Sequence, residues 1–136
     1  MRCRTFIAIA PLAAVLGSCS YVKDFLVDPT AMGEFTVHKD YEAVFRNVKT
    51  YTLQCYQEKD YEHKITIDAN LFSERKSAEV LVVRRGIDTA KYEMHVGIKL
   101  LGSDKTEVRV QDLYVQGAEH RLEGIKAAAN TGSASC

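Results

Sequence analysis

The stretch KYEMHVGIKLL, residues Lys91–Leu101, decides the fold. Apolar and polar residues alternate along it, and a period of two places successive side chains on opposite faces of a β-strand. The face expected to be apolar carries Tyr92, Met94, Val96, Ile98 and Leu100. The face expected to meet water carries Glu93, His95, Gly97 and Lys99. The stretch therefore predicts a strand of an antiparallel sheet that has one dry face and one wet face.

Three further strand candidates surround this stretch. Lys64–Phe72 alternates in the same way, Ala78–Val83 is rich in valine, and Thr106–Leu113 places two valines inward between polar residues. The connections between the four candidates are short and contain turn-forming residues, which favours consecutive hairpins. The sequence thus predicts a four-strand meander.

Two amphipathic helices are expected, one on each side of the meander in the sequence. Asp40 is the predicted N-cap of the first, and Glu42 lies in its first turn, where a negative charge suits the helix dipole. The first helix has an apolar stripe formed by Tyr41, Val44, Phe45, Val48, Thr52 and Cys55. The second has a stripe formed by Ala118, Leu122, Ile125 and Ala129, and Gly124 weakens this helix by up to about 1 kcal/mol relative to alanine.

A short strand, Phe35–Val37, precedes the first helix. The order strand, helix, four-strand meander, helix predicts an α+β fold in which two helices pack on one face of a curved antiparallel sheet. In the order of its elements this resembles the helix-grip arrangement, as in the domains of lipoprotein C of the outer-membrane barrel assembly machinery. The resemblance concerns the fold and implies no function, since function does not follow from fold.

The first 18 residues have the zones of a secretory signal peptide. Arg2 and Arg4 precede an apolar run of about a dozen residues. This run is too short to span a bilayer, which needs about 20 residues. The run ends at Leu16-Gly17-Ser18-Cys19, which resembles the lipobox of bacterial lipoproteins. Two alternatives are a cleaved signal that leaves Cys19 unmodified and a buried helix of a soluble domain.

The lipobox resemblance implies cleavage before Cys19, a diacylglycerol thioether on its sulfur, and a further acyl chain, such as palmitate, on its new amino group. Several acyl chains make a stable anchor, whereas one chain binds only marginally. The resemblance places the mature protein in the cell envelope, facing the periplasm. Ser20 after the cysteine implies the inner leaflet of the outer membrane.

Three segments follow from these expectations: a signal peptide over residues 1–18, a lipidated cysteine and tether over 19–33, and one α+β domain over 34–136. The 118 residues left after cleavage of the 136 are enough for one core and too few for two. Val22, Phe25 and Leu26 have helical spacing, so the tether either lies on the membrane or docks on the domain.

The charge balance argues against nucleic-acid binding. The precursor has 18 basic and 18 acidic residues, and removal of Arg2 and Arg4 leaves a small negative net charge. A nucleic-acid-binding domain would instead show a basic surplus on one face. The apolar content of 46% is that of an ordered globular protein.

The expected location in the cell envelope assigns a role to each of the four cysteines. Cys3 leaves with the signal peptide and Cys19 is taken by lipid, so Cys55 and Cys136 remain, and in an oxidising envelope they are expected to form a disulfide. The tail reaches Cys55 easily if the two helices run parallel and only with difficulty if they run antiparallel. The alternative is a buried thiol at Cys55 and a free one at the chain end.

No motif predicts a catalytic, cofactor or metal site. His38, His63, His95 and His120 lack metal-ligand spacing, and no Gly-x-Ser-x-Gly elbow or glycine-rich phosphate loop is present. Asp60, Glu62 and His63 form an acidic cluster that fits a solvated turn or a weak metal or partner contact. Paired carboxylates are defined in space, so the sequence does not address them.

The sequence therefore predicts a membrane-anchored lipoprotein without enzymatic activity or cofactor. The expected partners are the membrane, through the anchor, and an envelope protein, in an accessory role in envelope assembly or secretion. The alternative is a carrier that holds a small apolar ligand or lipid in a cavity between helix and sheet. A hydrolase is a more distant third.

Overall fold

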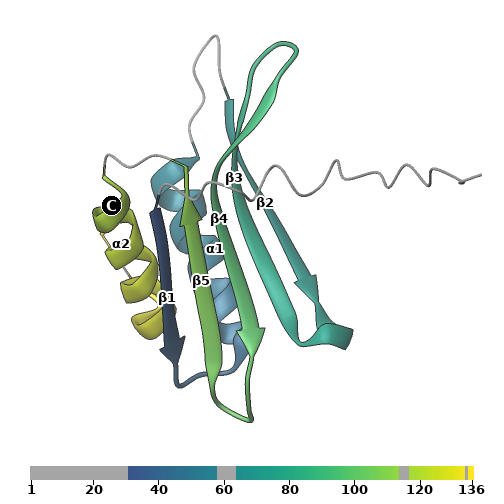
Figure 1. Ribbon diagram of the computed structural model, residues 1–136, viewed down its shortest axis with the longest axis vertical. Helices are drawn as coiled ribbons and strands as arrows, with labels where there is room; N and C mark the ends of the chain where they lie inside the picture. The colour runs from purple at the N-terminus through teal and green to yellow at the C-terminus, as the bar shows by residue number, and fades with distance from the viewer. Residues whose placement is uncertain (1–30, 58–63, 114–116, 134) are drawn as a thin grey trace, which may run out of the picture.

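The computed structural model describes residues 31–57, 64–113, 117–133 and 135–136. Five strands form one antiparallel sheet, and two helices cover one of its faces, which confirms the predicted α+β fold (Figure 1). The elements are β1 (Ala31–Val37), α1 (Tyr41–Tyr56), β2 (Lys64–Phe72), the 3₁₀ turn η2 (Ser73–Arg75), β3 (Ser77–Arg85), β4 (Ala90–Leu100), β5 (Thr106–Asp112) and α2 (Ala118–Thr131).

The sheet has the strand order β1-β5-β4-β3-β2, so the first strand lies beside the last one. Strands β2 to β5 form the predicted meander; on the covered face α1 lies over β2, β3 and β4, and α2 lies over β1 (Figure 1). Strand β1 begins at Ala31, before the predicted Phe35, and pairs with β5 from Ala31 opposite Asp112 to Val37 opposite Thr106. Residues 31–33, expected in the tether, therefore belong to the sheet.

Helix α1 starts as the sequence predicts. The Asp40 carboxylate accepts a hydrogen bond from the backbone N–H of Glu42 at 2.9 Å, which satisfies one of the free donors of the first turn. The predicted stripe is buried except for Cys55, which is half-buried. Tyr51 is buried as well, although it lies outside the stripe, because it faces α2 and not the sheet.

Helix α2 packs beside α1 through small residues. A Cβ built on Gly124 would lie 1.9 Å from the Tyr51 hydroxyl, so only glycine admits the tyrosine here. Helix α2 ends at Gly132, which has φ +79° and donates its N–H to the carbonyl of Ala128 at 2.8 Å. The glycine that weakens the helix is thus the one that lets the two helices meet closely.

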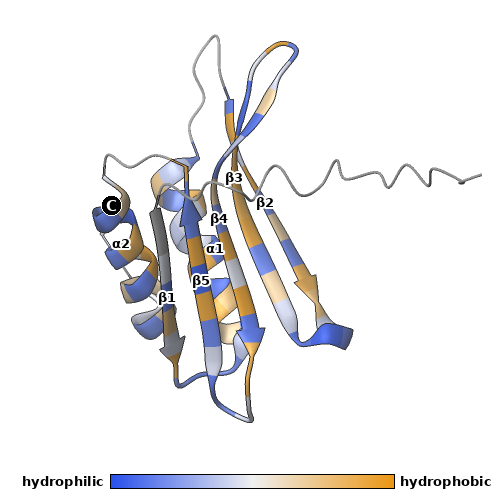
Figure 2. Ribbon diagram, in the orientation of Figure 1, coloured by the Kyte–Doolittle hydropathy of each residue, from blue (hydrophilic) through white to orange (hydrophobic). Residues whose placement is uncertain are grey.

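The core lies between the helices and the sheet. Its fully buried residues include Val44 and Val48 of α1, one valine from each of β3, β4 and β5, and Ile125 of α2. Along these strands apolar and polar residues alternate, which Figure 2 shows as alternating bands. The valine-rich composition suits a half-buried pleated sheet, on which branched side chains pack well.

A β-bulge changes the face of one residue of β4. Met94 lies opposite Val82, but Tyr92 lies opposite Val83, so Glu93 is the extra residue. Residues opposite each other in adjacent strands share a face, and Val82 and Val83 point to opposite faces. The expectation that Tyr92 shares the apolar face with Met94 is therefore wrong, and Tyr92 is 38% exposed.

Candidate functional site

A group of charged side chains lies where α1 ends, α2 begins and β4 and β5 meet on the covered face. Asp112 is the last residue of β5 and is only 3% exposed. It continues the inward series of Val108 and Val110, and its carboxylate accepts a hydrogen bond from Arg121 in the first turn and a half of α2. This ion pair fixes the start of α2 against the end of the sheet.

A second ion pair lies next to the first. The bulge directs Glu93 toward Arg84, and the Glu93 side chain is only 13% exposed. Between the two pairs is a small, partly open cavity of about 100 Å³, lined by Tyr56, Val82, Glu93, Met94, Asp112 and Arg121. The covered side of the sheet thus ends in a polar cluster and not in more apolar core.

Tyr56, at the end of α1, contributes a hydroxyl group to this cluster. Burial, followed by a hydrogen bond with Tyr51, raises the pKa of the Tyr56 phenol above its usual range, although Arg121 acts in the opposite direction. The two tyrosine rings meet edge to face, with centroids 5.8 Å apart. Tyr56 therefore stays protonated at neutral pH, with its hydroxyl hydrogen-bonded to Tyr51.

The chemistry of this cluster is limited by its charge and size. Both carboxylates are paired with arginines, and the lining residues include no serine, cysteine, histidine or lysine that could act as a nucleophile. Pockets that bury a small organic ligand have volumes of about 300 to 1,000 Å³. The cluster is thus better suited to holding the helices on the sheet than to binding a substrate.

The second candidate is the sheet face opposite the helices, which we call the open face. It carries, among others, Glu34, Glu79, His95, Gly97, Arg109 and Gln111. Arg109 lies 3.0 Å from Glu34 and 2.9 Å from Glu107, so it links β1 and β5. On the β2 side of this face, Arg85 contacts Asp68 at 2.7 Å.

His95 lies on the open face, as the sequence predicts, and near its centre. Its Nδ1 is 3.3 Å from Oε1 of Gln111, and its Nε2 is 3.6 Å from Oε2 of Glu79. Nε2 is inaccessible to solvent and makes no hydrogen bond among the described residues. The side-chain partners of the ring among the described residues are thus an amide and a carboxylate, Gln111 and Glu79.

Gly97 makes a shallow gap in the middle of the open face. A Cβ there would meet nothing closer than 4.0 Å, the distance to the carbonyl oxygen of Arg109 and to Cε1 of His95. Leu81, opposite His95, is half-buried and adds an apolar contact surface. The open face therefore presents both charges and apolar surface around the gap at Gly97.

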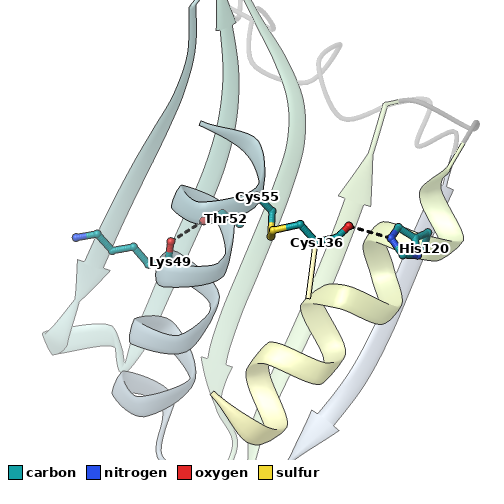
Figure 3. The surroundings of a disulfide bond; sticks show 5 residues. All are labelled: Lys49, Thr52, Cys55, His120 and Cys136. Atoms are coloured by element: carbon teal, nitrogen blue, oxygen red, sulfur yellow. Dashed lines mark hydrogen bonds between the residues drawn. A yellow bond between two sulfur atoms is a disulfide. The ribbon is translucent and has the colours of Figure 1, made fainter. Parts of the chain in front are cut away.

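The predicted disulfide between Cys55 and Cys136 is present, with its Cα atoms 5.3 Å apart (Figure 3). Beside it, Nε2 of His120 lies 3.4 Å from the carbonyl oxygen of Cys136. The helices run antiparallel, because Gly124 in the middle of α2 lies against Tyr51, whereas Gly132 at the end of α2 lies against Asn47, nearer the start of α1. The antiparallel arrangement is the less favourable one for this bond. Cys136 still reaches Cys55 because the chain turns back at Gly132 toward the end of α1.

The remaining predicted residues do not assemble into a site. Cys19, Asp60, Glu62 and His63 lie outside the described residues. Across ranges 31–57, 64–113, 117–133 and 135–136, no group of three or more histidines, cysteines or carboxylates could hold a metal ion. His38, His95 and His120 therefore do not converge on one centre.

Part of the polar cluster was detectable in the sequence. Asp112 follows the two-residue period of Val108 and Val110, so the alternation already directs it inward. Arg121 and Tyr56 carry no such signal, because their meeting depends on how two helices cross the sheet.

Comparison with known proteins assigns no family: no family model and no curated protein sequence matches the chain. Within the described part of the chain, no helix is both long enough and apolar enough to cross a bilayer.

Proposed function

We propose that this protein is an envelope lipoprotein without enzymatic activity, anchored through Cys19 in the inner leaflet of the outer membrane, whose domain binds an envelope protein through the open face. The lipobox-like Leu16–Cys19 supports the anchor. The disulfide between Cys55 and Cys136 supports an oxidising compartment, because disulfides persist in the periplasm and are rare in the cytosol.

The observation that carries the binding function is the contrast between the two faces of the sheet. Both described helices cover one face, whose core valines are fully buried, whereas the other face presents His95, Arg109 and Leu81 around the gap at Gly97. An accessory role in assembly or secretion is consistent with a surface whose charged and apolar side chains can contact a protein partner.

The alternative, a carrier of a lipid or small apolar ligand, has less support. The interior between α1 and the sheet is filled by Val44, Val48 and Val96, all of them at 0% exposure. The cavity on that side, of about 100 Å³, is too small for such a ligand, and two carboxylates and an arginine line it beside Tyr56, Val82 and Met94. Native mass spectrometry of protein from cells would favour the carrier if an apolar ligand were retained.

The anchor is tested by Cys19→Ser. We expect the variant to fold but to leave the membrane fraction, because the anchor is covalent lipid. Mass spectrometry of the wild-type N-terminus should find acyl chains on Cys19. A variant that stays in the detergent phase as strongly as wild type would contradict the lipoprotein assignment.

The open face is tested by Gly97→Arg, which fills the gap without touching the core. Gly102→Arg in the β4–β5 turn is the matched control, since a Cβ there meets nothing within 4 Å. After cross-linking in cells, the partner captured by wild type and by Gly102→Arg should be lost with Gly97→Arg. Equal capture by all three forms would remove the open face from the interaction.

A further inference from the structure

The hairpin between β3 and β4 projects beyond the rest of the sheet (Figure 1). At its tip, Ile87 is 96% exposed. The turn is ordered by a hydrogen bond from the N–H of Gly86 to the carbonyl of Thr89 at 2.8 Å, so its backbone groups are partly satisfied within the tip. An almost fully exposed isoleucine on a projecting hairpin is placed to enter an apolar environment outside this domain.

The hairpin lies at the end of the domain where the tether joins the sheet. Ala31, the first residue of β1, is opposite Asp112, and Asp112 is opposite Met94 of β4. Strand β4 continues from Met94 back to Ala90 before the turn, so the tip lies roughly 15 to 20 Å beyond the start of β1, at about 3.3 Å per residue.

The tether is long enough for the tip to reach a membrane that holds Cys19. The 12 residue steps from Cys19 to Ala31 span at most about 40 Å when fully extended. This is more than the projection of the hairpin, so the anchor and the tip can meet one bilayer surface at the same time.

The charge of the hairpin suits an anionic surface. Arg84–Lys91 contains three basic residues and one acidic residue, Asp88, and Arg84 is paired with Glu93 just outside this stretch. Arg85 and Lys91 are exposed and flank the tip on its two strands. Arg85 is paired with Asp68 at 2.7 Å, but the pair is exposed, and because such pairs contribute little to stability, the guanidinium can exchange the carboxylate for a phosphate group. Binding at a membrane interface grows with the apolar area that is buried and with electrostatic attraction to anionic lipids.

We propose that the β3–β4 hairpin is a second membrane contact, in which Ile87 enters an anionic phospholipid surface and Arg85 and Lys91 bind its phosphate groups. This inference rests on the lipid anchor proposed above. One acyl-anchored terminus leaves a domain free to rotate, whereas a second contact sets its orientation. The strands would then stand away from the bilayer, and the open face would be presented sideways to a partner.

The absence of tryptophan from the chain makes the contact measurable. Ile87→Trp introduces a single fluorophore at the tip. Leu101→Trp is the matched control, because Leu101 is 49% exposed and lies in the turn at the opposite end of β4. With Cys55 and Cys136 bonded, Cys19 of the mature chain is the one free thiol and can be coupled to a maleimide lipid in phosphatidylglycerol vesicles.

We expect the tryptophan at position 87 to shift to shorter wavelength and to be quenched by brominated lipid, while the one at position 101 keeps the emission it has in water. Equal, unquenched emission from both variants would overturn the proposal. A shift at position 87 only when an envelope extract is added would also overturn it and indicate a protein contact. Because the coupling is chemical, these outcomes do not depend on lipidation in cells.

A second measurement uses the unanchored Cys19→Ser protein and co-sedimentation with phosphatidylglycerol vesicles. Ile87→Asp should lower the vesicle association constant about tenfold or more, and Asp88→Asn should raise it. Binding should fall in phosphatidylcholine vesicles and at high salt. An unchanged association constant for Ile87→Asp would count against the hairpin.

Discussion

At the scale of single residues, the ion pair between Asp112 and Arg121 places a carboxylate in a buried position, where it depends on its partner. Asp112 is 3% exposed and Arg121 retains about a quarter of its side-chain exposure, so the carboxylate has lost most of its hydration. A buried charge tolerates this only with a partner in good geometry. The pair therefore serves to set the position of α2 more than to add net stability.

Asp112→Ala should lower the free energy of unfolding by about 3 kcal/mol, because it removes the carboxylate that Arg121 is paired with in a mostly buried position. Arg46→Ala is the control, since its pair with Glu42 is exposed and 3.8 Å long and contributes at most about 0.5 kcal/mol. Urea unfolding of both variants gives the comparison. Equal losses would mean that Asp112 is solvated.

Gly124→Ala tests the contact between the helices. In an exposed helix this change would stabilise by about 1 kcal/mol, but here the new Cβ would lie 1.9 Å from the Tyr51 hydroxyl. We expect a loss of about 1 to 3 kcal/mol in the free energy of unfolding, as for an overpacked core. Tyr51→Phe in the same chain should recover part of it, and a stabilised single variant would refute the close approach.

At the scale of elements, the sequence predicted what depends on local periodicity. The alternation in Lys91–Leu101 and the Asp40 cap each act within a few residues, and both are found as expected. The bulge at Glu93 was not predictable in this way, because a bulge depends on the register of a neighbouring strand. For this reason the alternation predicts the wrong faces for Tyr92 and Glu93 but the correct faces for Met94, Val96 and Ile98.

The register of β4 gives a test with opposite outcomes for adjacent residues. Val96→Asp and Ile98→Asp should unfold the domain, because each would bury a carboxylate at a position that is at most 2% exposed. His95→Ala should leave the fold intact, since His95 lies on the open face. Circular dichroism of the three variants distinguishes them. A folded Val96→Asp protein would mean that the register is inverted.

At the scale of the whole molecule, the arrangement depends on contacts between segments far apart in sequence. No pattern within β1 predicts that it lies beside β5, and none in the helices predicts that they run antiparallel. The cysteine count did predict the disulfide, because the expected location left only two thiols to pair. The number of cysteines and the expected oxidising location thus predict one long-range contact, which the periodicity of apolar residues does not predict.

The disulfide should account for a large part of the stability of the domain. It joins residues 81 apart, and closing such a loop is worth about 4.5 kcal/mol on the chain-entropy model, against a total of about 5 to 15 kcal/mol for a domain. In a Cys19→Ser background, Cys136→Ser should therefore lower the melting temperature by roughly 15 °C or more. Cys136 is exposed, so this change breaks the bond without burying a hydroxyl group.

Cys55→Ser should cause a similar fall, and wild type treated with a reductant should melt together with both variants, because all three lack the same bond. A reductant that leaves the melting temperature of wild type unchanged would contradict this account. So would two alkylatable thiols, at positions 55 and 136, in unreduced protein from the envelope. Either result would mean that the antiparallel helices are held together by the contact between Tyr51 and Gly124 and by the core alone. The turn of the tail at Gly132 would then not serve to form a disulfide.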